Sequence, residues 1–173
     1  MTELRADARR NLERVLDAAA EVFAASGPDA SIDEIARLAG VGHGTVFRRF
    51  PTKDDLMYAV IERHVTQVRA SAEEALAADD PGEAFFDFAR QAAQLMMTAP
   101  GLHKCFVHCG GKPGAAELEE LGRRVVARAQ RAGALRRDLE PGEVGPLLRA
   151  ALLAAPPGQW RRYLDVVLDG LRA

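Results

Sequence analysis

The amino-acid sequence predicts an all-α protein, and three observations support this prediction. Apolar residues recur at steps of three and four through most of the 173 residues, which is the period of a helix with one buried face. Alanine, leucine and arginine are prominent, whereas runs of β-branched residues are few, and this balance favours helix over strand. Breaks containing Gly and Pro separate the periodic segments. The chain is therefore expected to fold as a series of packed helices.

The first two predicted helices are separated by a short break. The first covers Arg9 to Phe23, where one apolar stripe runs along the segment, and Ser26-Gly27-Pro28 ends it. The next four-residue signal, Ser31-Ile32-Asp33-Glu34, matches a capping box. It predicts a short second helix that runs to about Ala39.

A tight turn and a third helix follow. Gly40 tolerates a left-handed backbone, and Gly42 stands where a new helix needs its N-cap. The third helix is predicted from about His43 to Phe50. A helix, a tight turn and a second helix form a helix-turn-helix, which places the N-terminal residues of its second helix in the DNA major groove. His43, Thr45 and Arg48 are therefore candidates for contacts with base edges.

A long fourth helix and a more apolar fifth helix come next. Thr52 and Asp55 form a second capping-box pattern, which predicts a helix running towards Ala78. Residues 79–82 form a loop. In residues 83–98 apolar side chains surround most of the helix and leave one narrow polar stripe, so this helix is expected at the centre of a second domain.

The central helix and the segment after it supply a candidate small-molecule pocket. Such pockets are mostly apolar with a few orienting polar groups. The apolar lining is predicted from Phe85, Phe88, Ala92, Met96, Leu102 and Phe106, with Gln91 and His103, or Gln94, as orienting groups. The alternative interpretation is that these apolar side chains are plain core.

Two cysteines and two histidines gather between residues 103 and 109. Cys105 and Cys109 lie one helical turn apart, and both residue types bind Zn²⁺. However, His103 and His108 fall on different faces of a helix, and cysteine is among the most buried side chains in any case. We expect structural burial rather than metal binding or redox sensing. The segment Gly110–Gly114 is interpreted as a loop, because no strand precedes it as a phosphate-binding loop requires.

Charge and hydropathy limit the possible partners. The net charge is −2, so DNA binding has to rely on a local patch. Residues 1–66 hold nine Lys and Arg against eleven Asp and Glu, which argues against DNA binding. Residues 1–10 lack the apolar core of a signal peptide, and no apolar stretch approaches the roughly 20 residues of a membrane span. We expect a cytoplasmic protein without membrane contact.

The stretch from Ile35 to Leu56 resembles the signature of the TetR family of transcriptional regulators at nearly every fixed position. The matching residues read Ile35-Ala36-x-x-Ala39-Gly40-Val41-Gly42-x-Gly44-Thr45-Val46-Phe47-x-x-Phe50-x-x-Lys53-x-x-Leu56. We therefore expect a helix-turn-helix DNA-binding domain of three helices in residues 1–55. Residues 56–173 are expected to form a helical effector-binding and dimerisation domain.

The resemblance implies roles for individual residues. Thr45 and Lys53 would contact phosphates, and Gly44 would let the backbone approach the DNA. Phe47 departs from the usual Tyr, so it keeps the ring and loses a hydroxyl that would bond a phosphate. Arg48 and Arg49 are expected to compensate electrostatically. The alternatives are a core position for Phe47 and solvated surface charges for the two arginines.

Three further helical segments complete the chain, at about 115–132, 144–155 and 160–171. The last two carry apolar stripes that need a partner. The resemblance implies that these helices pair across a two-fold axis in a homodimer. The predicted interface residues are Leu148, Leu152, Trp160, Leu164, Val167 and Leu168. The alternative is that both stripes pack within one subunit.

Together these features predict a repressor that binds palindromic double-stranded operator DNA and is released by a small-molecule effector, with no cofactor or metal. An enzyme would need a convergent nucleophile, base and oxyanion groups, and no spacing in the sequence provides them. The alternative function is a helical protein-interaction module whose DNA binding has lapsed. The acidic balance of residues 1–66 and the presence of Phe47 are the observations behind that alternative.

Overall fold

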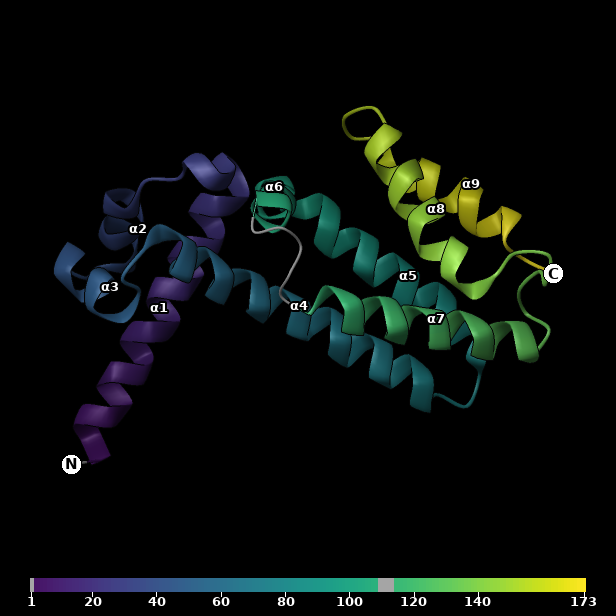
Figure 1. The fold of residues 1–173 in the computed structure, drawn as a ribbon, viewed down its shortest axis with the longest axis horizontal. Helices are drawn as coiled ribbons and strands as arrows, with labels where there is room; N and C mark the ends of the chain where they lie inside the picture. Colours follow the sequence, from purple (N-terminus) through teal and green to yellow (C-terminus); the bar gives the residue numbers. More distant parts are fainter. Residues whose placement is uncertain (1, 109–113) are drawn as a thin grey trace. The chain divides into compact units, whose positions relative to one another are not determined.

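The computed structural model describes residues 2–108 and 114–173, and these residues are helical almost throughout (Figure 1). The prediction of an all-α fold is confirmed. The elements are α1 (Thr2–Ser26), a 3-10 turn (Gly27–Asp29), α2 (Ile32–Ala39), α3 (His43–Arg49), α4 (Lys53–Ala77), α5 (Pro81–Thr98), α6 (Pro100–His108), α7 (Ala115–Arg131), α8 (Pro141–Ala154) and α9 (Trp160–Gly170). In the described ranges the only β feature is an isolated bridge between Leu135 and Arg172.

The chain divides into two compact units, and the predicted domain boundary at residue 55 stays a prediction. The first unit comprises Met1–His64 together with Thr98–Pro113, so α6 joins the helices of the N-terminal region. Figure 1 shows α6 beside the C-terminal part of α1, and both α1 and the 3-10 turn pack against it.

Gly101 makes the contact between α6 and α1 possible. A Cβ atom at this position would lie 1.9 Å from the carbonyl oxygen of Phe23 and 2.5 Å from that of Ala24. Atoms cannot approach that closely, so the backbone of α6 rests directly on the end of α1 because residue 101 has no side chain. Sequence periodicity carries no information about this close approach of α6 to α1.

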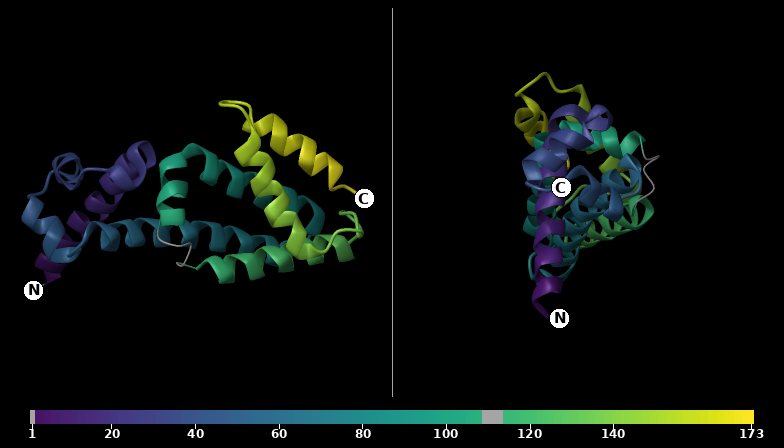
Figure 2. Two further views of the ribbon diagram at one scale, coloured as in Figure 1. Left: turned by 45° about the horizontal axis from the view of Figure 1, so that its top comes forward. Right: turned by 90° about the vertical axis from the view of Figure 1, so that its left-hand side faces the viewer.

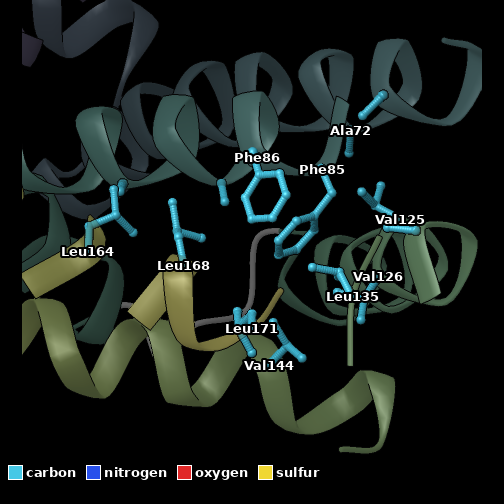
Figure 3. Packing of buried hydrophobic residues seen from close by; sticks show 14 of the residues in the cluster. Ala72, Phe85, Phe86, Val125, Val126, Leu135, Val144, Leu164, Leu168 and Leu171 are labelled. Atoms are coloured by element: carbon cyan, nitrogen blue, oxygen red, sulfur yellow. The ribbon is translucent and has the colours of Figure 1, made fainter. Parts of the chain in front are cut away.

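The second unit comprises Val65–Met97 and Gly114–Ala173. Figure 3 shows its core, in which Phe85 and Phe86 of α5 face side chains of α7, α8 and α9. The two phenylalanine rings meet edge to face, with centroids 5.2 Å apart, which is a favoured geometry for aromatic pairs. α5 is buried on most sides as predicted, while Asp87, Arg90 and Gln91 of its polar stripe are exposed.

Polar side chains donate hydrogen bonds to backbone carbonyls at and near the helix ends in this unit. Arg128 of α7 donates hydrogen bonds to the carbonyl oxygens of Ala75, at 3.0 Å, and of Ala78. Both carbonyls lie at the C-terminal end of α4, where backbone acceptors lack partners within the helix. The buried amide of Gln130 donates to the carbonyls of Arg136 and Leu139 at 3.0 and 2.8 Å. These bonds tie the end of α7 to its neighbours.

Helices α8 and α9 form an adjacent pair, seen from two further directions in Figure 2. α8 begins with a capping box, in which Glu140 and Glu143 each bond the other's backbone amide. Among the described residues, none of the helices combines the length and apolar character that crossing a bilayer requires.

Candidate DNA-binding site

Helix α2 has the ends that its sequence predicts. The Ser31 hydroxyl accepts a hydrogen bond from the Glu34 amide at 3.5 Å, which caps the first turn. Gly40 ends the helix with φ of +66°, a left-handed conformation that is costly for residues with a side chain. The amide of Val41 then bonds the carbonyl of Ala36 at 3.0 Å. This turn directs the chain into α3.

Buried apolar side chains pack the two short helices on each other and on α1. They are Ile35, Ala36 and Ala39 of α2, Val46 of α3, and Phe50 just beyond it, with Val15, Ala19, Val22 and Phe23 of α1 also buried. Because one face of α3 is held in this way, the opposite face is directed outward. The arrangement is the predicted helix-turn-helix.

The predicted DNA-contacting residues of α3 lie on this outward face. His43, Gly44, Phe47, Arg48 and Arg49 are exposed, and Thr45 is half-buried. No heavy atom lies within 4 Å of where a Cβ would sit on Gly44, so the space beside its backbone is open. α3 therefore presents two guanidinium groups, a hydroxyl and two rings on one short helix.

Arg48 folds back along α3. Its Nε donates to the carbonyl of Gly44 at 3.2 Å, and a terminal nitrogen donates to the hydroxyl of Thr45 at 3.4 Å. The guanidinium is thereby held over the N-terminal half of the helix while its side chain stays exposed. The positive charge lies at the end that a recognition helix directs towards the base edges.

Phe47 is a surface residue rather than a core residue, with 38% of its area exposed. Its ring lies 4.5 Å from the ring of His43, at an interplanar angle of 32°. The two rings form a continuous aromatic surface at the start of α3. The core alternative for Phe47 does not fit this exposure.

Lys53 is the first residue of α4, next to a capping box that forms as predicted. The Asp55 carboxylate accepts hydrogen bonds from the amide and hydroxyl of Thr52 at 2.9 and 2.7 Å, and the Asp55 amide donates to the Thr52 hydroxyl at 3.1 Å. The half-buried Lys53 thus lies at a well-ordered helix N-terminus, where the helix dipole also favours an anion.

One residue of this surface was not predicted from the sequence. Asp33, in the first turn of α2, lies with its Oδ1 2.5 Å from Nδ1 of His43, across a separation of ten residues. The pair joins the two helices of the motif on their exposed side. Helical periodicity relates residues three or four positions apart, so it contains no signal for this contact.

The predicted effector-binding residues divide between the two units. Phe85 is fully buried in the core of the second unit, where Phe88, Ala92 and Met96 are half-buried and Gln91 is exposed. Leu102 and His103 lie on α6 in the first unit, the former buried and the latter half-buried. Phe106 also lies on α6, but its side chain is outside the described residues.

A cleft of about 550 Å³ lies within the second unit, between α5 and α9. Its lining residues are Arg90, Gln91, Gln94, Leu95, Trp160, Arg161, Leu164 and Asp165. The Arg161 guanidinium lies 4.3 Å from the centre of the Trp160 ring and donates a hydrogen bond to the Gln94 side chain at 2.8 Å. Of the eight predicted effector-binding residues, the cleft includes Gln91.

The predicted dimer residues mostly face inward. Leu152, Trp160, Leu164 and Leu168 are buried within the subunit, whereas Leu148 and Val167 are half-buried. The four buried side chains belong to the intramolecular core, which was the alternative interpretation of the two stripes. The exposed large apolar side chains of these helices are Leu147 and Leu153 on α8, and Tyr163 and Val166 on α9.

The cysteine and histidine cluster has no metal-binding arrangement in the part of the chain that the structure describes. Cys105 is fully buried, in accordance with the structural role expected for it. His108 is exposed, and its Nε2 lies 3.7 Å from the Asp54 carboxylate. Cys109 and most of the loop at 110–114 lie outside the described residues.

Comparison with known proteins identifies the family. Residues 15–60 match the family model described as "Bacterial regulatory proteins, tetR family", and residues 80–173 match "Transcriptional regulator SbtR-like, C-terminal domain". The chain belongs to the TetR family of DNA-binding transcriptional regulators. The family is one of regulators rather than enzymes, and its helix-turn-helix is the motif built from α2 and α3.

Relatives with solved structures match along almost the whole chain. A TetR transcription regulatory protein from Mycobacterium vanbaalenii is 41% identical, with a TM-score of 0.74, and the match covers 98% of this chain and 99% of that one. The TetR regulator SCO0520 from Streptomyces coelicolor is 30% identical, with a TM-score of 0.72 and coverage of 92% and 97%.

The curated relatives match over a shorter region. The uncharacterized HTH-type transcriptional regulator TtgW of Pseudomonas putida is 47% identical over 57 residues, which are 32% of this chain and 42% of that protein. The chain thus matches less than half the length of this relative. The resemblance to the curated proteins is confined to about a third of this chain.

Proposed function

We propose that the protein is a repressor that binds, as a homodimer, to an operator with two-fold symmetry and is released from it by a small molecule. The observation that carries the proposal is the exposed face of α3. It combines Arg48, Arg49 and an aromatic surface with the adjacent Lys53 at the start of α4. Residues of this kind contact base edges and phosphates in helix-turn-helix complexes.

The proposed contacts divide into two classes. His43 and Arg48 read base edges, because His43 begins α3, the Arg48 guanidinium folds back towards Gly44 and Thr45, and both side chains remain exposed. Thr45 and Lys53 bind phosphates, supported by Arg49 and by the ring of Phe47. Gly44 lets the backbone approach the DNA, in keeping with the open space beside it.

A binding assay with the DNA flanking the protein's own gene tests this assignment. Lys53→Met should lower the affinity for every sequence and reduce the slope of log affinity against log salt by about one per protomer. Arg124→Met removes an equally positive exposed side chain on α7, outside the helix-turn-helix, and should leave the slope unchanged. An unchanged slope for Lys53→Met would refute the phosphate contact. No binding by the wild type would favour the protein-interaction alternative.

The proposed dimer uses the exposed apolar residues of α8 and α9. Leu147, Leu153, Tyr163 and Val166 are 43%, 59%, 37% and 65% exposed, which leaves apolar area for a partner to cover. The half-buried Leu148 and Val167 directly follow Leu147 and Val166 on the same two helices, and both pack against the core of the subunit. Two-fold pairing then duplicates α3, and the operator repeats its half-sites about one DNA turn, roughly 34 Å, apart.

Sedimentation velocity tests the interface. Val166→Glu places a charge on the proposed interface and should shift the protein towards monomer. Val107→Glu is a matched control, since Val107 on α6 is 63% exposed and lies outside α8 and α9. If both variants keep the wild-type oligomeric state, or if the wild type is a monomer, the proposed interface is wrong.

The cleft between α5 and α9 is the proposed effector site. Its volume of about 550 Å³ falls within the range of small-molecule pockets. Release from DNA requires that the effector bind the DNA-incompetent state more tightly than the competent one. Bound DNA must then lower the affinity for the effector by the same factor as the effector lowers the affinity for DNA.

Trp160 allows a direct test, because it lines the cleft and is the only tryptophan of the chain. Compounds from a small-molecule library that dissociate the protein–DNA complex should also change the Trp160 fluorescence. Compounds that release DNA while the emission stays unchanged would show that the effector binds elsewhere.

A further inference from the structure

We propose that Asp33 is a positioning residue that orients the His43 ring, so that Nε2 of His43 reads one base in each half-site. The inference rests on the proposed DNA-binding function and deepens it. It assigns a base preference to the first residue of α3 and makes that preference depend on a residue of α2.

The geometry restrains the ring from two sides. Oδ1 of Asp33 lies 2.5 Å from Nδ1 of His43. The ring of Phe47, one helical turn further along α3, lies 4.5 Å away and tilted by 32°. A carboxylate at one edge and an aromatic ring at one face leave the histidine little freedom to rotate. A surface side chain without such contacts would sample several rotamers and lose more entropy on meeting DNA.

The hydrogen bond also decides which ring nitrogen remains available. A carboxylate accepts hydrogen bonds, so the proton of the pair lies on Nδ1 of His43. Nε2 is then the atom left for an external partner. In the neutral ring Nε2 accepts from the amino group of adenine or cytosine, and in the protonated ring it donates to N7 or O6 of guanine. Either mode discriminates between bases.

The contact with His43 also explains why the acidic Asp33 lies on a surface proposed to bind DNA. An isolated carboxylate in the first turn of α2 would repel the phosphates of bound DNA. Asp33 is 81% exposed and His43 is 52% exposed, so the pair contributes little to the core. Substitutions at either position should therefore leave the fold intact, and their effects on DNA binding can be measured in folded protein.

The test uses the full-length protein and a library of random duplex DNA. The wild type selects a preferred sequence, and affinities are then measured for that duplex and for duplexes changed at single positions. His43→Ala should lose the base preference at one position per half-site. The ratio of affinities for the preferred and the changed base should fall there by about two- to tenfold, which corresponds to the free energy of one hydrogen bond. Asp33→Ala should lose the preference at that same position and at no other.

Two comparisons separate positioning from a general charge effect. In the His43→Ala background, Asp33→Ala should have no further effect on the base preference, because its action passes through the ring. Asp33→Asn keeps an oxygen that accepts the Nδ1 proton and should restore most of the preference. Glu34→Ala is the charge-matched control: it removes a neighbouring exposed carboxylate and should leave the preference unchanged.

The outcomes distinguish this inference from the proposed function. If the wild type enriches no sequence, the DNA-binding function itself fails. If a sequence is enriched but Asp33→Ala keeps the wild-type preference at every position, DNA binding stands and the positioning role is refuted. The same conclusion follows if Asp33→Ala changes the preference equally with and without His43.

Discussion

Phe47 in the first unit and Phe86 in the second lie in opposite surroundings. In the first unit Phe47 lies on the surface of α3, 38% exposed and against the His43 ring. In the second unit Phe86 is 2% exposed, packed edge to face on Phe85, with the Arg172 guanidinium 4.1 Å from its ring centre. The first unit buries Phe23 and Phe50 in its own core, so its exposed Phe47 ring is not needed for packing, whereas Phe86 belongs to the core of the second unit.

The strongest test of this comparison replaces each ring by alanine. Phe86→Ala leaves a cavity in the core and should lower the free energy of unfolding by about 3–5 kcal/mol. Phe47→Ala should cost less than about 1 kcal/mol, because the ring is already partly in water. Urea denaturation followed by circular dichroism, at equal protein concentration, measures both. Equal losses would contradict the contrast between the exposed Phe47 ring and the buried Phe86 ring.

A smaller effect is expected at the contact of α6 with α1 in the first unit. Gly101→Ala forces the helices apart, since the new methyl group would overlap the Phe23 carbonyl, and should cost about 1–3 kcal/mol. Gly122→Ala, within α7, is the control because no heavy atom lies within 4 Å of its Cβ position. It should stabilise by about 0.5–1 kcal/mol. Thermal unfolding measures both, and an unchanged or higher melting temperature for Gly101→Ala would show that Gly101 is not needed for the packing.

The smallest expected effect is at an exposed ion pair in the second unit. Two hydrogen bonds of 2.6 Å from Arg136 hold the pKa of Asp138 below its ordinary value. Because the pKa is lower in the folded state, the pair stabilises the fold at neutral pH. That contribution is lost as the pH falls through the lowered pKa.

Asp138→Asn should therefore lower the melting temperature slightly at pH 7, and the difference from wild type should vanish below the lowered pKa. Asp79→Asn, at an exposed carboxylate of the loop before α5, is the matched control. It should leave the melting temperature at the wild-type value both at pH 7 and in acid. A difference that persisted in acid would show that Asp138 acts through something other than its charge.

Local signals explain why the helix-turn-helix could be predicted residue by residue. Ser31 caps α2, Gly40 ends it, and Thr52 with Asp55 begins α4, each through contacts no more than a few residues apart. Val46 of α3 and Phe50 just beyond it are buried. The exposed positions of His43 and Arg48 follow from the helical spacing within α3.

The second unit was predicted less completely, because its apolar stripes have several possible partners. Periodicity in α8 and α9 predicted that Leu164 and Leu168 are buried, but it did not distinguish a partner subunit from the same chain. The structure places both inside the subunit and leaves Val166 on the outside. The pairing of Asp33 with His43 was missed for a related reason, since it depends on how α2 crosses α3.

The sequence by itself determined the all-α class, the succession of helices and the helix-turn-helix, because caps, glycine turns and apolar spacing act over a few residues. Tertiary structure alone decided that α6 packs with α1, which apolar faces of α8 and α9 turn inward, and that Asp33 meets His43. These features depend on contacts between different helices. Several packings share the same apolar periodicity, and the closeness of the backbones and the volumes of the side chains select one of them.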